Sequence, residues 1–242
     1  MNSDPGTWWR IGLLTLLLGA ALETWERRLA APVTPEAAAA TASVEAWFET
    51  AGTWRPLLAD GFWLQANLAW ERRAETEVRW LTRLAVAAEP QTPYFRVNAA
   101  RMLAYDFPSW RAAREPLAPE AVKQAWRQRA ADEAIAFLLG ASPEEISAEL
   151  WVEAGGIALY GKGDPREAAA LYQRAARMDG APWTAGRICA RLLLETGQHA
   201  AALAWLEEWL PRLPADDPEA GRDWVVDRIA ELKGLRARTE PF

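Results

Sequence analysis

Four residues with side chains suited to binding recur at helical spacing between positions 60 and 70. Asp60, Trp63, Asn67 and Trp70 follow an i, i+3, i+7, i+10 pattern, which places them along one face of a helix. Aromatic rings offer contact area, while a carboxylate and an amide form directional hydrogen bonds. Such a face suits recognition of another chain or of a sugar. The other interpretation is that Trp63 and Trp70 are core residues.

The residue types that most catalytic schemes need are scarce. Among 242 residues there is one His, His199, and one Cys, Cys189, so an internal disulfide or a thiolate metal cluster is excluded. The sequence has no glycine-rich phosphate loop, metal-ligand cluster or nucleophile elbow. We therefore expect a protein that is not an enzyme, with no catalytic residue, no cofactor and no metal site. We expect His199 to be exposed and Cys189 to be a small buried residue.

Composition and charge indicate a helical protein that does not bind nucleic acid. Fifty Ala stand against 15 Val plus Ile, and Ala favours helix while β-branched residues favour strands. A net charge of −6 argues against nucleic acid, whose binding proteins usually carry a basic patch.

The N-terminal region carries an uncharged apolar run at residues 11–22. A helix needs about 20 apolar residues to cross a bilayer, so the run alone is short. Trp8, Trp9 and Trp25 flank it, as interfacial aromatic residues flank membrane spans. We expect residues 8–25 to associate with a membrane as an anchor. A cleaved signal peptide and a buried core helix are the alternatives.

Capping residues followed by proline mark several helix starts, and glycines mark several ends. The starts are Thr34-Pro35, Thr92-Pro93, Ser142-Pro143, Asp164-Pro165 and Asp217-Pro218. Between these marks the sequence predicts helices at 35–51, 54–72, 75–88, 94–105, 119–139, 144–160, 165–178, 183–195, 198–212 and 218–235. An irregular insertion at 106–119, with three prolines, interrupts the series.

A pattern of small and aromatic residues repeats after 34 positions. Gly163, Ala168, Tyr172, Ala175 and Gly180 recur as Gly197, Ala202, Leu206, Trp209 and Pro214. Small residues let two helices approach closely, a turn glycine joins them, and Pro or Gly ends the unit.

This spacing resembles the tetratricopeptide repeat at residues 149–182 and 183–216, and more weakly at 59–92. Gly155 and Cys189 depart from it, because they stand where that family favours Leu. The stretches LLADGFWLQANLAWERR and TPYFRVNAARMLAYDFPSWR also resemble an uncharacterised group of bacterial, membrane-anchored repeat proteins.

The resemblance implies an all-α fold, a right-handed solenoid of antiparallel helical hairpins. It would have an N-terminal apolar helix and a C-terminal capping helix. The expected organisation is an apolar helix at 1–30, a linker and first helix at 31–53, repeats at 54–216 with the insertion at 106–119, and a capping helix and tail at 217–242.

In the repeat alignment, four residues fall at the first-helix positions that line the concave groove of tetratricopeptide domains. These residues are Asp60, Trp63, Asn67 and Trp70. The matching positions in later units are Tyr94, Arg101, Glu153, Tyr160, Arg187 and Arg191. Aromatic platforms and paired guanidiniums suit a peptide with a carboxylate or an acidic side chain. The alternative is that these arginines form a solvated face.

We therefore expect a non-catalytic scaffold or adaptor that binds a protein partner in its groove at the bacterial inner membrane, on a side that the sequence leaves open. A location in the cytoplasm or periplasm as a soluble protein is the alternative. Two other functions stay open: a carbohydrate-binding or carbohydrate-active helical envelope protein, with carboxylates such as Asp60, Glu71 and Asp106, and a structural subunit of a larger envelope complex.

Overall fold

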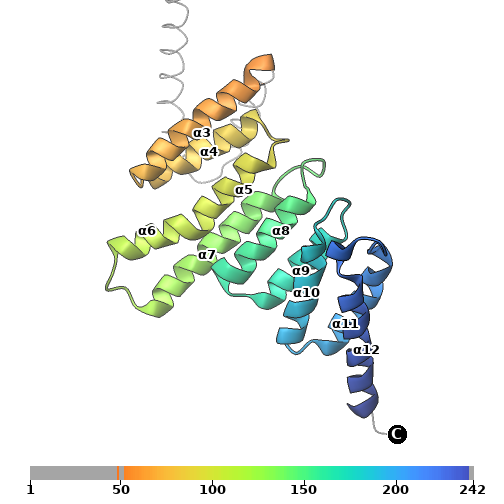
Figure 1. Ribbon diagram of the computed structural model, residues 1–242. Helices are drawn as coiled ribbons and strands as arrows, with labels where there is room; N and C mark the ends of the chain where they lie inside the picture. Colours follow the sequence, from red (N-terminus) through yellow and green to blue (C-terminus); the bar gives the residue numbers. More distant parts are fainter. Residues whose placement is uncertain (1–47, 49–51, 240–242) are drawn as a thin grey trace, which may run out of the picture. The chain divides into compact units, whose positions relative to one another are not determined.

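The computed structural model describes Phe48 and residues 52–239, and the chain divides into two units at Arg55. In the first unit, Phe48 is buried and helical, and Gly52–Trp54 forms a short 3₁₀ turn, η1. Within the described residues all regular structure is helical (Figure 1). The prediction of an all-α fold is therefore confirmed for this part of the chain.

The helices are joined by short connections, most of them turns of a few residues. In chain order they are α3 (Arg55–Glu71), α4 (Glu75–Ala88), α5 (Pro93–Arg101), η2 (Met102–Asp106), α6 (Phe107–Arg114), α7 (Glu120–Leu139), α8 (Ala148–Gly156), η3 (Ile157–Lys162), α9 (Pro165–Ala176), α10 (Trp183–Glu195), α11 (His199–Trp209), η4 (Leu210–Arg212), η5 (Pro218–Ala220) and α12 (Arg222–Thr239).

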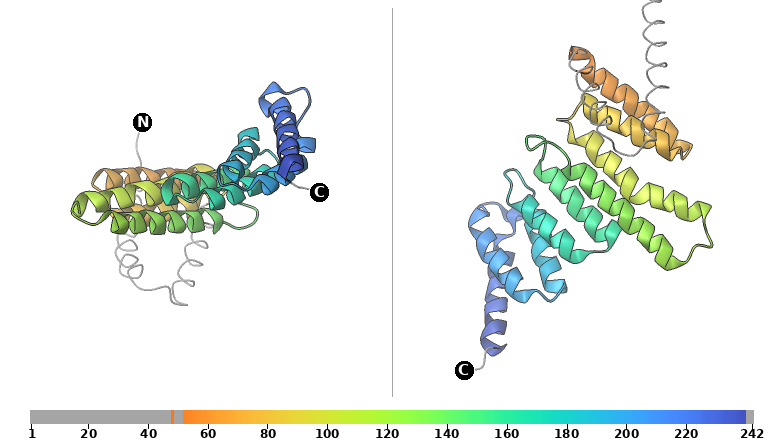
Figure 2. Two further views of the ribbon diagram at one scale, coloured as in Figure 1. Left: turned by 90° about the horizontal axis from the view of Figure 1, so that it is seen from below. Right: turned by 180° about the vertical axis from the view of Figure 1, so that it is seen from behind.

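Helices that follow one another along the chain lie side by side in the second unit (Figures 1 and 2). From α8 onward each helix packs against the next, up to α11 against α12, and α5 contacts both α7 and α8. The result is a series of antiparallel helical hairpins. We call α3, α5, α8 with its continuation η3, and α10 the first helices of these hairpins, and we call α4, α7, α9 and α11 the second helices.

Glycines allow large aromatic rings to enter the helix contacts. A Cβ atom at Gly155 would lie 2.9 Å from ring carbons of Tyr172, and one at Gly186 would lie 2.2 Å from the ring of Trp209. Tyr172 and Trp209 are both buried. The Gly155 departure from the repeat pattern therefore has a steric reason, since a Leu there would overlap Tyr172.

The expected irregular insertion at 106–119 is wrong over most of its length. The chain continues as a helix from Pro93 to Arg114, through the π-helical segment η2. The N–H of Phe107 donates to the carbonyl of Met102, five residues earlier. Pro108 lacks an N–H and crowds the preceding turn of a regular helix, and the wider π turn accommodates it. Only residues 115–119 remain as a turn before α7.

The expected helix start at Ser142 is also wrong, because α8 begins at Ala148 with Ser147 as its cap. The Ser147 hydroxyl accepts a hydrogen bond from the N–H of Leu150. Glu145 instead pairs with the buried guanidinium of Arg96 on α5, at 2.8 Å. This ion pair ties the segment before α8 to α5, in place of a first helical turn.

The cap at Asp217 is present, but it starts a 3₁₀ turn. Its carboxylate accepts from the N–H of Glu219 at 2.8 Å. Gly221 then takes a left-handed conformation, with φ of 68°, and ends η5. The α-helix α12 starts one residue later, at Arg222.

Among the described residues, the structure contains no helix with the length and apolar character needed to cross a membrane. The expected anchor at residues 8–25 and the expected helix at 35–51 lie outside the described residues, except for Phe48.

Candidate partner-binding site

The predicted residues on α3 divide into packed and exposed side chains. Trp63 is half-buried, and its ring centroid lies 5.6 Å from the rings of both Tyr94 and Phe95 on α5. Asn67 donates to the carbonyl of Trp63 at 2.8 Å, so its amide serves its own helix, whereas Asp60 is exposed. For Trp63 the contacts favour the interpretation as a packing residue.

Trp70 combines an exposed face with a fixed orientation. Its side chain is 38% exposed, and its indole N–H donates to the Asp106 carboxylate at 2.8 Å. The ring also lies 6.2 Å from the ring of Trp110 on α6. Asp106, expected in an irregular insertion, thus lies in η2 and orients Trp70.

An ion pair brings Arg101 of α5 and Glu153 of α8 together. The guanidinium Nε and Nη2 donate to the two carboxylate oxygens at 2.8 and 2.6 Å. The hydrogen bond to Glu153 raises the pKa of Arg101 above its ordinary value. Tyr105 of η2 lies close by: burial, with the Glu153 charge second, raises the pKa of its phenol to about 12. The repeat positions gave no signal for Tyr105, because the π segment shifts it out of register.

Two further tyrosines, Tyr160 of η3 and Tyr172 of α9, interact electrostatically with Tyr105 beside this ion pair. Tyr160 is 73% exposed and Tyr172 is buried, while Tyr94, at the start of α5, is 54% exposed. Burial raises the pKa of Tyr172; Tyr160 and Glu153 raise it further, and the charge of Arg191 on α10 opposes them. The structure therefore brings Glu153, Tyr160 and Arg191 into one neighbourhood across α8, η3, α9 and α10.

Arg187 of α10 has a structural contact that the sequence did not indicate. It donates to the carbonyl of Glu219 at 3.1 Å, and a Cβ at Gly221 would come within 2.7 Å of its guanidinium. Next to it, Trp183 donates to the Asp217 carboxylate at 3.1 Å. Arg187 therefore holds the η5 turn against α10.

A cavity of about 350 Å³ lies between α10 and α12. Its walls combine guanidinium groups with large apolar side chains, namely Arg187, Ile188, Arg191, Leu194, Trp224 and Arg228. The repeat pattern predicted the two arginines of α10. It missed Trp224 and Arg228, because the last helix was expected only to close the array.

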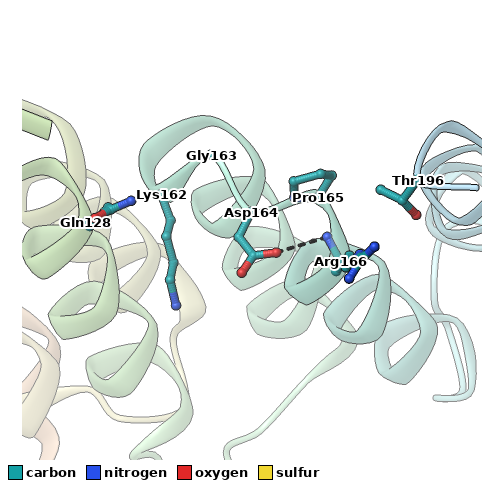
Figure 3. A pocket seen from close by; sticks show the side chains of 7 residues that line it. All are labelled: Gln128, Lys162, Gly163, Asp164, Pro165, Arg166 and Thr196. Atoms are coloured by element: carbon teal, nitrogen blue, oxygen red, sulfur yellow. Dashed lines mark hydrogen bonds between the residues drawn. The ribbon is translucent and has the colours of Figure 1, made fainter. Parts of the chain in front are cut away.

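A second cavity, of about 330 Å³, lies at the turn between η3 and α9 (Figure 3). Lys162 bonds Asp132 and Glu167, at 2.8 and 2.5 Å, and these carboxylates raise its pKa. In Figure 3 the Asp164 carboxylate turns to the backbone N–H of Arg166, which it caps at 3.0 Å. The charges here serve the turn and the helix start, so we do not regard this cavity as the binding site.

A third cavity, of about 350 Å³, lies between α4, α6 and α7, and its charges are largely paired. Arg79 forms ion pairs with Glu75 and Glu133, and Arg114 also contacts Glu75. Arg111 bonds Glu115 and stacks on the ring of Trp126 at 4.2 Å. This network joins helices, which is sufficient to explain it.

Comparison with known families identifies a repeat in the C-terminal half of the chain. A family model matches residues 159–222, a range that includes α9, α10, α11 and the arginines at 187 and 191. The match is to the tetratricopeptide repeat. None of the curated proteins compared with the chain matches it at a significant level. Residues 159–222 are therefore similar to tetratricopeptide repeats, which generally mediate protein–protein interactions, and the helical hairpins of the described residues agree with this similarity.

The tetratricopeptide match begins at Leu159 and ends at Arg222, so Trp224 and Arg228 lie just beyond it. Cys189 is buried and His199 is exposed, as expected. Burial raises the pKa of the Cys189 thiol to about 12, which leaves it protonated and unreactive at neutral pH.

Proposed function

We propose that this protein is a non-catalytic interaction scaffold that binds a segment of a protein partner along its first helices. The observation that carries the proposal is the set of exposed aromatic and charged side chains on those helices, above all Tyr94, Tyr160 and Arg191. In the proposed solenoid these helices would line the groove. Tyrosines and arginines are the residue types that contribute most at protein interfaces.

The preference for an acidic partner segment would arise at the C-terminal part of this face. Arg101 is neutralised by Glu153 at 2.6 Å, whereas Arg191 has only a long contact of 3.5 Å to Glu195, with both side chains more than half exposed. A partner segment with acidic side chains would therefore gain most near Arg191. Arg187 contributes charge there as well, although one of its N–H groups is used by the η5 turn.

We further propose that residues 8–25 hold the scaffold at the bacterial inner membrane. The support is the apolar run at 11–22 with tryptophans at both ends, as in membrane-interface belts. Fractionation of cells that produce the full chain, beside a variant without residues 1–30, tests this. Release of both forms into the soluble fraction would contradict anchoring and leave the scaffold proposal standing.

The two other functions are less well supported by the side-chain contacts. Hydrolysis of a glycosidic bond needs two carboxylates that flank the bond. One oxygen of Asp106 already accepts a hydrogen bond from the Trp70 indole N–H. Neither Asp60 nor Glu71 lines any of the three cavities described above. A subunit of a larger envelope complex would present tryptophans as interface anchors, whereas the ring of Trp63 packs on Tyr94 and Phe95 and Trp70 is 38% exposed.

Affinity capture tests the proposed function. The full chain is purified from native membranes in parallel with an Arg191→Glu, Tyr160→Ala variant and with an Arg83→Glu, Ala170→Ser control on the second helices, where both residues are exposed. We expect one defined protein to accompany the wild type and the control, and to be lost from the variant. Equal recovery with a folded variant would contradict binding along the first helices.

A further inference from the structure

The cavity between α10 and α12 has two chemically different sides. Arg187, Arg191 and Arg228 supply guanidinium groups, while Trp224 and two aliphatic side chains of α10 supply apolar surface. Arg228 lies over the Trp224 ring at 5.8 Å, so the aromatic and cationic parts adjoin. A ligand that satisfies the whole cavity must therefore carry an anionic group and an apolar group next to each other.

The positive charge of this cavity is not balanced by its own walls. Arg187 bonds a backbone carbonyl, which carries no net charge. Arg191 has a long contact of 3.5 Å to Glu195, whereas Arg228 pairs with Glu231 at 2.6 Å; neither of these carboxylates lines the cavity. By contrast, three glutamates line the cavity between α4, α6 and α7 beside its four arginines. In a chain of net charge −6, three arginines around an apolar wall mark a site for an anionic group.

Hydrogen bonds near the η5 turn hold the start of α12 in place beside α10. Arg222, the first residue of α12, donates to the carbonyls of Leu210 and Leu213, each at 2.9 Å. The η5 turn is bonded to α10 through Trp183 and Arg187. The start of α12 is thus fixed against α10 before any ligand binds, which lowers the entropic cost of binding.

The size of the cavity argues for part of a protein segment rather than a large ligand. Its volume of about 350 Å³ is at the lower end of the range for small-molecule sites, which is roughly 300–1,000 Å³. Such a volume accommodates one or two side chains. Arg191 lines the cavity and also belongs to the first-helix face that we propose for the partner, so the cavity continues that face.

We propose that this cavity binds an acidic side chain of the partner segment together with an adjacent large apolar side chain, and that α12 supplies half of the site through Trp224 and Arg228. The inference rests on the proposed function and names the partner chemistry. The carboxylate would bond Arg191, whose contact with Glu195 is long at 3.5 Å, and the N–H groups of Arg228 that the Nη1 contact with Glu231 does not use. The apolar side chain would pack on Trp224. The last helix is then a recognition element as well as the end of the array.

Selection from a library of random twelve-residue peptides displayed on phage tests this chemistry with the purified full chain. We expect the wild type to enrich peptides in which Asp or Glu directly adjoins Leu, Ile, Phe or Trp. The Arg191→Glu, Arg228→Glu variant should lose the acidic preference, and Trp224→Ala should keep it while losing the apolar one. The control is Arg83→Glu, Arg129→Glu, which makes the same charge change at two exposed positions on α4 and α7.

The dissociation constants of one selected peptide for the wild type and for each variant then give the size of each residue's effect on binding. Loss of a charge-assisted hydrogen bond costs about 1.5–3 kcal/mol, so each arginine reversal should weaken binding by about tenfold to a hundredfold. Circular dichroism of each variant shows that it is folded. Enrichment of basic or uncharged peptides by the wild type would overturn the acidic site but not the scaffold. Enrichment of no peptide would overturn both, and equal binding by the folded double variant would overturn the cavity assignment alone.

Discussion

Arg101 and Glu153 join α5 to α8 through two parallel hydrogen bonds, Nε to Oε1 at 2.8 Å and Nη2 to Oε2 at 2.6 Å. The pair connects the first helices of two successive hairpins. It also neutralises Arg101, which the repeat pattern had assigned to partner binding. In the recognition that we propose, acidic ligands would therefore bind near α10 and α12, where no carboxylate lines the cavity.

A double-mutant cycle on Arg101 and Glu153 should give a coupling free energy of about 1 kcal/mol or less. The Arg101 side chain is 53% exposed and that of Glu153 is 14% exposed. Exposed ion pairs contribute about 0.2–1 kcal/mol, and the exposed guanidinium keeps this pair at the upper end of that range. Urea unfolding of Arg101→Ala, Glu153→Ala and the double variant measures it. A coupling free energy well above this range would show that solvent screens the ion pair much less than the exposure of Arg101 indicates, and would contradict our description.

Gly186→Ala should destabilise the protein by about 3 kcal/mol, because the new Cβ would overlap the ring of the buried Trp209, and overpacking of this kind costs about 1–3 kcal/mol or more. Thermal or urea unfolding measures the loss.

Gly61→Ala is the matched control, since it lies on α3 and a Cβ there would meet nothing within 4 Å. Alanine is favoured over glycine inside a helix by about 0.5–1 kcal/mol, so this variant should be slightly more stable. A Gly186→Ala protein as stable as Gly61→Ala would contradict the close packing of Trp209.

Cys189 should resist alkylation in the folded protein. Burial raises the pKa of its thiol to about 12, and the thiolate is the reactive form. We expect iodoacetamide at pH 8 to leave the native protein unmodified and to label it fully in urea, as read by mass spectrometry. Rapid labelling without denaturant would place the thiol at the surface.

Two of the four tyrosines should titrate above the ordinary range. Burial raises the pKa of Tyr105 to about 12 and also raises that of Tyr172. A pKa raised on folding stabilises the native state below the unfolded pKa near 10, and this stabilisation is lost as the pH rises from 10 to 12. Ultraviolet titration should therefore ionise about half of the tyrosines late, with stability falling over the same interval. Four tyrosines that ionise together near pH 10 in the folded protein would contradict the burial.

Much of the fold was predictable because its signals are local. Helix periodicity and caps gave α4 and α10 with their observed bounds, and the Asp164 cap bonds the backbone as expected. The failures arose where a distant residue decides the local structure. The insertion was mispredicted because Pro108 is accommodated by a π turn, and the start of α8 was misplaced because Glu145 pairs with Arg96.

The sequence predicted which residues of the candidate site share a face of one helix, but not which residues of different helices contact each other. Spacing placed Arg187 and Arg191 on one face of α10, and both line the cavity. It could not show that the Trp63 ring packs on Tyr94 and Phe95. It also missed Trp224, because a contact between α10 and α12 depends on the η5 turn and leaves no periodic signal.

Site-specific photo-crosslinking tests the central claim, that a partner lies along the first helices, most directly. A benzoylphenylalanine residue is placed in the full chain at Tyr94 or Tyr160, and in matched variants at the exposed second-helix residues Ala170 and Ala204. We predict that irradiation of producing cells yields a defined protein adduct from the tyrosine positions and none from the alanine positions. Adducts from Ala170 or Ala204 alone, or from none of the four positions, would contradict it.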